Sequence, residues 1–190
     1  MLKLENLCSI RSGQTFKRSW NDYDKGDIIV LQPKDIADGE PSKEILMISE
    51  YEIPYLNKHL LQKGDIVLVN RGTRFNSWMY NGTPAKMVVT TAFYVITLNT
   101  DKILPEFFNW YLGQQEVKDY FDLNATGTTI RGINKKSLME LPVPNIPLKL
   151  QKHIVELVEK TKEEQRLLSE LKKIRKTYVE NYIWEQIRNY

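Results

Sequence analysis

Short runs of β-branched and aromatic residues, separated by Gly, Pro, Asn and Asp, recur through the first half of the chain. Four such runs lie at residues 27–32, 44–48, 64–70 and 86–98. Runs of this length and composition are typical of β-strands, so each predicts one strand. Between the last two runs, Asn81 and Gly82 predict a hairpin, because both residues tolerate the positive φ of a type I′ turn.

The apolar pattern changes to a helical period at Pro105. Aromatic residues and leucine recur at helical spacing along "PEFFNWYLGQQEVKDYF", residues 105–121. The fixed φ of proline suits the first turn of a helix. We expect this apolar stripe to lie in the core, where the helix covers a curved sheet.

The segment "PVPNIP", residues 142–147, separates this region from the rest of the chain. Its prolines cannot continue a helix or pair as a central strand, and Pro147 is placed to begin the next helix. From Leu148 to about Tyr190 there is no Pro or Gly, and one apolar stripe runs between charged faces. The stripe includes Leu157, Thr161, Leu168, Leu171, Ile174, Tyr178 and Tyr182.

A helix of this length, roughly 60 Å at ~1.5 Å per residue, needs a partner surface along its stripe. Gln165 and Arg175 interrupt the stripe, which favours a short antiparallel pair or docking on another protein over a long parallel zipper. The whole pattern predicts a mixed α+β fold. A strand-rich globular domain at residues 1–146 precedes a long C-terminal α-helix at 147–190, which forms a coiled coil.

Composition agrees with one buried domain, since 42% of the 190 residues are hydrophobic. The first residues lack the charged and apolar regions of a secretory signal, and no apolar run approaches the roughly 18 residues that span a bilayer. We therefore expect a cytoplasmic protein without a membrane partner. Cys8 is the single cysteine, which excludes an intramolecular disulfide and a cysteine-based zinc site, and we expect it to be buried.

The net charge is only +3, so the position of the charges matters more than their sum. Cations alternate with aromatic and amide residues in "SGQTFKRSW" (12–20) and "NRGTRFNSWMYNGTPAK" (70–86). Cations attract phosphate, while amides, hydroxyls and aromatic rings can contact bases. These segments therefore suit a nucleic-acid surface. The alternative is solvated loops whose aromatic residues lie in the core.

Motifs for catalysis or cofactor binding do not occur in the sequence. There is no glycine-rich phosphate loop, nucleophile elbow, H-E-x-x-H motif or clustered set of metal ligands. Asp65 with Glu116 and Lys118 matches a nuclease pattern only weakly, because the last two fall in a predicted helix where such charges are ordinary surface. We expect a chain that binds without catalysing, and that needs no cofactor of its own.

Six segments in order carry a resemblance to a known family. They are "SIRSGQTF", "LQPKDI", "LQKGDIVLVNRGT", "TTAFYVI", "ILPEFFNWYL" and "GTTIRGINKKSLMELPVPNIPLKLQKHIVELV". Together they resemble the specificity subunits of type I restriction-modification systems. Family members usually have P-P-L-x-E-Q where this chain has "IPLKLQ", so Leu150 replaces an acid.

The resemblance implies a target recognition domain that binds double-stranded DNA in the major groove. It also implies a helix that docks modification subunits, with a restriction subunit as a further partner. Such subunits usually carry two recognition domains and two helices, whereas this sequence has one of each. We expect a half-subunit that forms a homodimer, or a fragment of a longer protein.

The DNA surface is predicted from the cations and polar residues of the loops. We expect one cleft to be lined by the cations Lys17, Arg18, Arg71, Arg74 and Arg131, with neutral hydrogen-bonding groups from Gln14, Asn76, Thr128 and Thr129. Arg71 and Arg74 would contact guanine, and Lys17 would contact phosphate. The candidates are Gln14, Lys17, Arg18, Trp20, Arg71, Arg74, Asn76, Trp78, Lys86, Thr128, Thr129 and Arg131. For Arg131 the alternative is a structural hydrogen bond to its own loop.

Two other functions stay open from the sequence. One is a truncated or regulatory protein that binds modification subunits without delivering them to DNA. The other is an enzyme such as a nickase, which the lack of an acid cluster in the loop-rich half disfavours.

Overall fold

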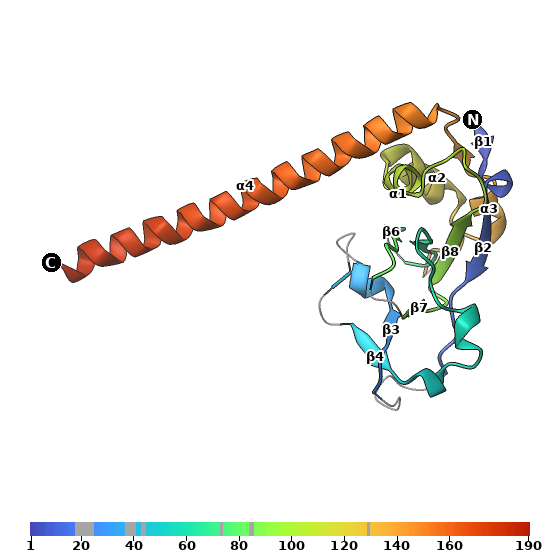
Figure 1. Ribbon diagram of the computed structural model, residues 1–190, viewed down its shortest axis with the longest axis horizontal. Helices are drawn as coiled ribbons and strands as arrows, with labels where there is room; N and C mark the ends of the chain where they lie inside the picture. Colours follow the sequence, from blue (N-terminus) through green and yellow to red (C-terminus); the bar gives the residue numbers. More distant parts are fainter. Residues whose placement is uncertain (18–24, 37–40, 43–44, 73, 84–85, 129) are drawn as a thin grey trace. The chain divides into compact units, whose positions relative to one another are not determined.

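The computed structural model describes residues 1–17, 25–36, 41–42, 45–72, 74–83, 86–128 and 130–190 (Figure 1). Internal contacts divide the chain into two units, Met1–Leu148 and Lys149–Tyr190. The first unit contains strands and short helices, and the second belongs to a single long helix. The predicted fold class, a mixed α+β globule followed by one long helix, is confirmed.

The larger sheet of the globular unit has four antiparallel strands in the order β2-β8-β5-β6. They are β2 (Cys8–Ser12), β8 (Phe93–Leu98), β5 (Ile66–Val69) and β6 (Ser77–Met79). β2 and β8 run side by side in Figure 1. All four residues of β5 are buried, which is why its sequence is continuously apolar and does not alternate.

A second sheet has three strands in the order β4-β3-β7, with β3 antiparallel to β4 and parallel to β7. The strands are β3 (Ile28–Leu31), β4 (Leu46–Ile48) and β7 (Met87–Val89). Met87 and Val89 pack in one apolar cluster, whereas Val88 packs in another. Successive side chains of a strand point to opposite faces, so this sheet lies between two parts of the core.

Residues 86–98 form two strands, β7 and β8, and not the single strand that their composition predicts. A turn at residues 90–92 separates them, and they belong to different sheets. The predicted hairpin at Asn81-Gly82 is also wrong, because β6 pairs with β5 and not with β7. Gly82 has a positive φ but Asn81 does not. Asn81 instead accepts a hydrogen bond from the Thr83 N–H at 2.9 Å through its own side chain, which makes a local turn.

The predicted helix at 105–121 is divided into α1 (Pro105–Leu112) and α2 (Gln115–Asn124). α1 ends at Gly113, whose N–H donates to the Trp110 carbonyl at 3.1 Å, and the Gln114 N–H donates to the Tyr111 carbonyl at 3.0 Å. The expected apolar stripe is in the core, where Phe107, Phe108 and Phe121 are almost completely buried. The Tyr111 hydroxyl donates to the Pro142 carbonyl at 2.6 Å, which ties α1 to the segment that precedes the long helix.

The beginning and the end of the globular unit pair with each other. β1 (Leu2–Lys3) is antiparallel to β9 (Pro142–Val143). The Leu4 N–H continues the pairing by donating to the Leu141 carbonyl at 3.0 Å. Short 3-10 helices lie at Leu4–Asn6, Pro33–Ile36, Glu50–Glu52 and Leu56–Lys58.

The last helix, α4 (Leu148–Arg188), has 41 residues. Its bounds agree with the prediction of a helix from Leu148 to about Tyr190, because neither Pro nor Gly interrupts the segment. Among the described residues, no helix is long and apolar enough to cross a membrane.

Candidate nucleic-acid interface

Two loops that are distant in the sequence are joined by backbone hydrogen bonds. One loop starts at Asn70, directly after β5, and the other connects α2 to α3 (Lys135–Met139). Arg71 forms an antiparallel bridge with Gly132. The Gly72 N–H donates to the Arg131 carbonyl at 2.9 Å, and the Ile133 N–H donates to the Asn70 carbonyl at 3.0 Å. These bonds fix the cation-rich segment against the "GTTIRG" segment.

The loop from Thr126 to Gly132 also closes on itself. Thr126 and Gly132 exchange two backbone hydrogen bonds of 2.9 Å each. Gly127 inside the loop has φ +105°, and a Cβ added there would lie 2.4 Å from the Ile130 carbonyl oxygen. Only glycine fits this position, which explains why glycine punctuates a stretch of hydroxyl and apolar residues.

A cleft of about 550 Å³ opens where the joined loops meet the ends of two strands. Asn70 and Arg71 line it from one loop, and Thr126, Ile130 and Asn134 line it from the other. Ser12 at the end of β2 and Tyr94 at the start of β8 complete its polar and aromatic wall. Asn134 also caps α3, since its side chain accepts a hydrogen bond from the Ser137 N–H at 2.8 Å.

The charge in the cleft is positive. Arg71 is exposed, and no carboxylate stands among the described residues that line the cleft. Burial raises the pKa of Tyr94, while the positive charge of Arg71 acts in the opposite direction. Both side chains line the cleft.

The side chain of Arg131 turns away from this cleft. Its guanidinium pairs with the Asp122 carboxylate at 3.1 Å and also donates to the Asp122 backbone carbonyl. The bond thus reaches the end of α2 and not the loop that contains Arg131. Both charged side chains are largely exposed, and exposed pairs contribute only about 0–1 kcal/mol.

The other described candidates lie at or near the surface. Lys17, Arg74 and Thr128 are exposed. Gln14 is partly buried, and its backbone bonds to Val89 and Thr91 hold it beside the β7–β8 turn. The Asn76 side chain donates to the Ile36 carbonyl at 3.2 Å. Three candidates, Arg18, Trp20 and Thr129, lie outside the described residues.

Two candidates have a different environment from the one we expected. Trp78 is only 8% exposed and packs in the core, with its ring 5.9 Å from that of Tyr80. Its place on the predicted DNA surface is therefore corrected, because β6 turns this side chain inward. Lys86 is partly exposed but pairs with Asp27 at 2.8 Å and Glu50 at 3.3 Å, so its charge is neutralised within the protein.

Most of the uncharged groups that line the cleft could not be identified from the sequence. Asn70 was included in a predicted strand, although a polar residue at the end of an apolar run was a signal for it. Ser12, Thr91 and Tyr94 lie in strands or turns whose pairing was not known. No local pattern could have brought these residues together with Thr126 and Asn134, because they are contributed by four separate segments.

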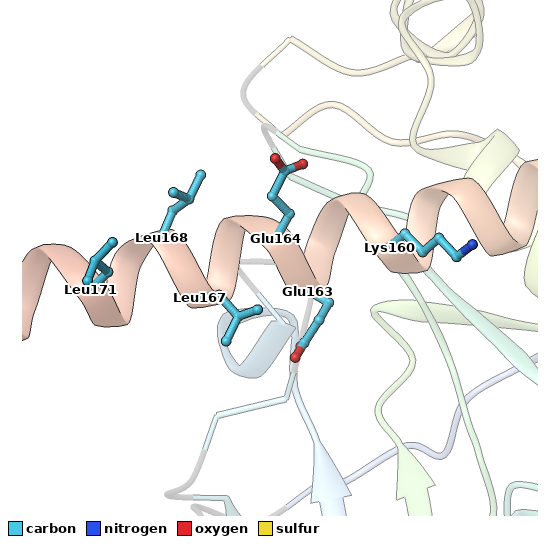
Figure 2. A pocket seen from close by; sticks show the side chains of 6 residues that line it. All are labelled: Lys160, Glu163, Glu164, Leu167, Leu168 and Leu171. Carbon is cyan, nitrogen blue, oxygen red and sulfur yellow. The ribbon is translucent and has the colours of Figure 1, made fainter.

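The long helix presents a separate apolar surface. Every member of the predicted stripe, from Leu157 to Tyr182, is exposed in the single chain. Figure 2 shows the segment around Leu167, Leu168 and Leu171, where Leu167 and Leu168 leave the helix on different sides. Leu167 was not part of the predicted stripe, so the apolar surface is wider here than expected.

The fold and the cleft define a class of protein. It is a mixed α+β module that presents a cation and neutral hydrogen-bonding groups from rigidly joined loops, and it carries a long helix with an uncovered apolar face. The model of the family described as "Type I restriction modification DNA specificity domain" matches residues 1–174. The chain belongs to this family, and its function is that of a DNA specificity domain.

Three solved structures have a similar fold. One is a chain of a type I R-M system, described in terms of complex assembly and conformational transition, with TM-score 0.64 and 19% identity over 88% of this chain and 39% of that one. Another is the HsdS subunit from Thermoanaerobacter tengcongensis, with TM-score 0.59 and 19% identity over 86% of this chain and 37% of that subunit.

The type I restriction-modification S subunit from M. genitalium has TM-score 0.52 and 17% identity, over 93% of this chain and 43% of that subunit. The chain therefore spans about two fifths of the length of these structures. A comparison with curated protein sequences gives no match.

Proposed function

We propose that this chain binds a short DNA sequence through the joined loops at residues 70–72 and 126–133. It would act as the specificity subunit that directs modification and restriction subunits of a type I system to their target. The observation that carries the proposal is the cleft, in which Arg71 projects beside neutral hydrogen-bonding groups without a lining carboxylate among the described residues.

The cations divide into two roles. Arg71 and Arg74 follow β5 on one connection and are exposed, so they are our candidates for bidentate contacts to guanine. Lys17 is our candidate for a phosphate contact, since an ammonium acts as a point charge. Arg131 joins them when DNA binds, because a phosphate can replace Asp122 in an exposed pair that contributes little to stability.

The proposal is tested with Arg71→Ala and Arg74→Ala combined. The target is first identified by mapping methylation in a genome that carries this chain and its modification subunit. Each lost base contact should then cost about 1–3 kcal/mol of specific binding, and each lost phosphate contact should reduce the salt slope by about 0.9. Binding is measured by salt titration.

A matched control removes two exposed lysines outside the loops, Lys34→Ala with Lys118→Ala. This double variant has the same net charge as the test variant, and we expect it to retain specific binding. Specific binding that survives in the arginine variant would exclude these loops as the recognition surface.

The chemistry would come from the partner subunits. The sequence has no cofactor motif, so the isolated chain should neither cleave nor methylate DNA. Methylation at the target should appear when the modification subunit and S-adenosylmethionine are added, and the family resemblance implies that adenine is the modified base. Methyl transfer by the isolated chain would overturn the non-catalytic assignment. The chain would act in the cytoplasm, with DNA as its ligand.

The exposed stripe of α4 supports a homodimer as the working form. A single globular unit contacts few base pairs, whereas two units on paired antiparallel helices would add their binding energies and read two half-sites. The modification subunits would dock on the same helices. Without self-pairing, the chain would instead depend on those subunits to cover its stripe.

A further inference from the structure

The wall of the cleft carries two isoleucines that differ in exposure. Ile133 is 2% exposed, whereas Ile130 is 66% exposed, and both line the cleft. The buried isoleucine anchors its loop in the core, while the other presents its side chain to solvent at the cleft. A single exposed apolar residue is ordinary on a protein surface. The meaning of Ile130 therefore depends on how the fold holds it and on what stands beside it.

Hydrogen bonds hold the two ends of the loop that presents Ile130. Thr126 and Gly132 exchange two backbone bonds of 2.9 Å each. A side chain at Gly127 would collide with the Ile130 carbonyl oxygen, so the chain packs closely against itself inside the loop. Branching at Cβ also restricts the χ1 angle of an isoleucine. Ile130 is therefore a preorganised apolar group, whose contact with a ligand would cost little ordering entropy.

Arg71 determines the kind of surface that Ile130 would meet. It forms a bridge with Gly132, two residues after Ile130 in the chain, and the side chains of Arg71 and Ile130 both line the cleft. The contact that we assign to Arg71 lies in the major groove, where guanine presents O6 and N7. Ile130 would then enter the same groove. The apolar group that base edges present there is the C5-methyl group of thymine.

The chemistry of the groove favours thymine opposite an isoleucine. Contact between the side chain and a methyl group removes apolar surface of both partners from water. Against another base, the same side chain would cover hydrogen-bonding groups without replacing their water partners, which is unfavourable. An isoleucine side chain can neither donate nor accept a hydrogen bond. Ile130 would therefore stabilise one base at its position and disfavour the others.

We propose that Ile130 contacts the C5-methyl group of a thymine and makes this chain prefer thymine at one position of its target. The inference rests on the proposed DNA-binding function and deepens it, because it assigns one base to one side chain. Two residues span at most about 7 Å, and base pairs are stacked about 3.4 Å apart. The thymine should therefore lie within about two base pairs of the guanine that Arg71 contacts.

The test removes the methyl group from the DNA and the side chain from the protein. Once methylation mapping has identified the target, each thymine is replaced in turn by uracil, which lacks the C5-methyl group and keeps the base pair. At one thymine for each bound globular unit, uracil should weaken binding by the wild-type chain about fourfold, which corresponds to ~0.8 kcal/mol for one buried methyl group. Binding is measured by titration of the full chain at one salt concentration.

Ile130→Ala should weaken binding to the native duplex and should bind the thymine and uracil duplexes equally at that position, because the methyl group has lost its partner. The two changes are then not additive, which is the signature of a direct contact. Ile130→Val keeps part of the apolar contact and should retain part of the preference for thymine. Since the residue is exposed, the thermal melting of both variants should match that of the wild type.

Leu123→Ala is the matched control. Leu123 is 85% exposed, lies near the end of α2 and is not part of the cleft lining. This variant should bind every duplex as the wild-type chain does and keep the preference for thymine. Loss of that preference in the control would contradict the assignment to Ile130.

Three further outcomes would overturn the inference. Specific binding that is insensitive to uracil at every thymine would show that no methyl group is read, and would leave the proposed function intact. An equal loss on thymine and uracil duplexes in Ile130→Ala would show packing on DNA without base preference. Unchanged DNA binding in Ile130→Ala, with weaker association with the modification subunit, would make Ile130 a protein contact. Specific binding that survives in the Arg71→Ala, Arg74→Ala variant would instead refute the proposed function.

Discussion

Buried polar residues show how the fold satisfies its few interior charges. Asp65 is 2% exposed. Its carboxylate accepts hydrogen bonds from the Thr97 hydroxyl at 2.6 Å and the Gln62 N–H at 2.9 Å, and Arg11 lies 3.5 Å away. These contacts explain why a carboxylate can occupy this buried position. Asp65 therefore has a structural role, which removes the reason to include it in a nuclease site.

Asp65→Ala should lower the free energy of unfolding by about 1–3 kcal/mol, because it leaves the Gln62 N–H and the Thr97 hydroxyl without their acceptor. Denaturant unfolding measures the loss. Asp101→Ala, at an exposed turn, is the control and should change stability by about 0.5 kcal/mol or less. Equal stabilities of the two variants would contradict this account.

Cys8 makes stability depend on pH in the alkaline range. Burial raises the pKa of its thiol from 9.0 to about 11. Above pH 9 the unfolded chain loses the proton while the folded chain keeps it, so the free energy of unfolding should fall as the pH rises towards about 11. The stabilising contribution of the protonated thiol to the free energy of unfolding should be fully present below pH 9.

Cys8→Ala isolates this effect from the tyrosines that titrate in the same range. The difference in unfolding free energy between wild type and variant should change only between pH 9 and about 11. Reaction with a thiol reagent should be slow in the folded chain and fast after unfolding. A difference that is independent of pH would contradict the raised pKa.

The sequence predicted the charged part of the site better than its neutral part. Arg71 could be found because cations cluster around it in the sequence. Asn70 could not, since its importance comes from bonds to Thr91, Ala92 and Ile133. Trp78 was assigned to the surface because its neighbours are polar, but β6 turns alternate side chains inward.

At the scale of elements, local patterns predicted the type of structure but not the pairing. The strand signals for β3, β4 and β5 and the long helix α4 were correct. β2 was not predicted, because Arg11 and Ser12 interrupt its apolar pattern. The runs at 86–98 and 105–121 were each divided by a turn. A single strand at 86–98 would keep β7 and β8 in one sheet, whereas β7 pairs with β3 and β8 with β2 and β5.

The stripe of α4 makes a prediction about self-association. Burying a large apolar side chain contributes roughly 1.5–3 kcal/mol, so pairing that covers several exposed leucines is favourable. The isolated chain should sediment as a dimer at micromolar concentration. Leu168→Glu with Leu171→Glu should convert it to a monomer, because charges would face apolar side chains across the seam.

The control introduces two glutamates on another face of the helix. Ser169→Glu with Lys173→Glu places two glutamates four residues apart, where the test variant has them three apart, at exposed positions away from the stripe. This variant should remain dimeric. A wild-type monomer would exclude the self-paired helix and favour coverage by modification subunits.

For the whole molecule, the proposed dimer predicts the symmetry of the target. Two identical units related by a two-fold axis read an inverted repeat. For both to face one side of B-DNA, the half-sites should be centred about one helical turn apart, ~10 base pairs or ~34–36 Å. The 41 residues of α4 give roughly 60 Å of helix at ~1.5 Å per residue, which is enough for overlapping helices at this spacing.

Methylation mapping checks this prediction directly. The modified sequence should be palindromic when the chain acts with its modification subunit alone. An asymmetric target would show that a second, different recognition unit takes part. A palindrome with another spacing would keep the two-fold axis but exclude the one-turn separation.

The pairing of β1 with β9 brings the two ends of the globular unit together, which suits a unit that can be exchanged as a whole. Leu2 faces Val143, and Lys3 faces Pro142, so the chain enters and leaves this unit at one place. A different segment with the same pairing ends can replace residues 4–141 while the following helix keeps its sequence. We therefore expect that exchange of this one continuous stretch would change the DNA sequence recognised while the long helix keeps its proposed role in assembly.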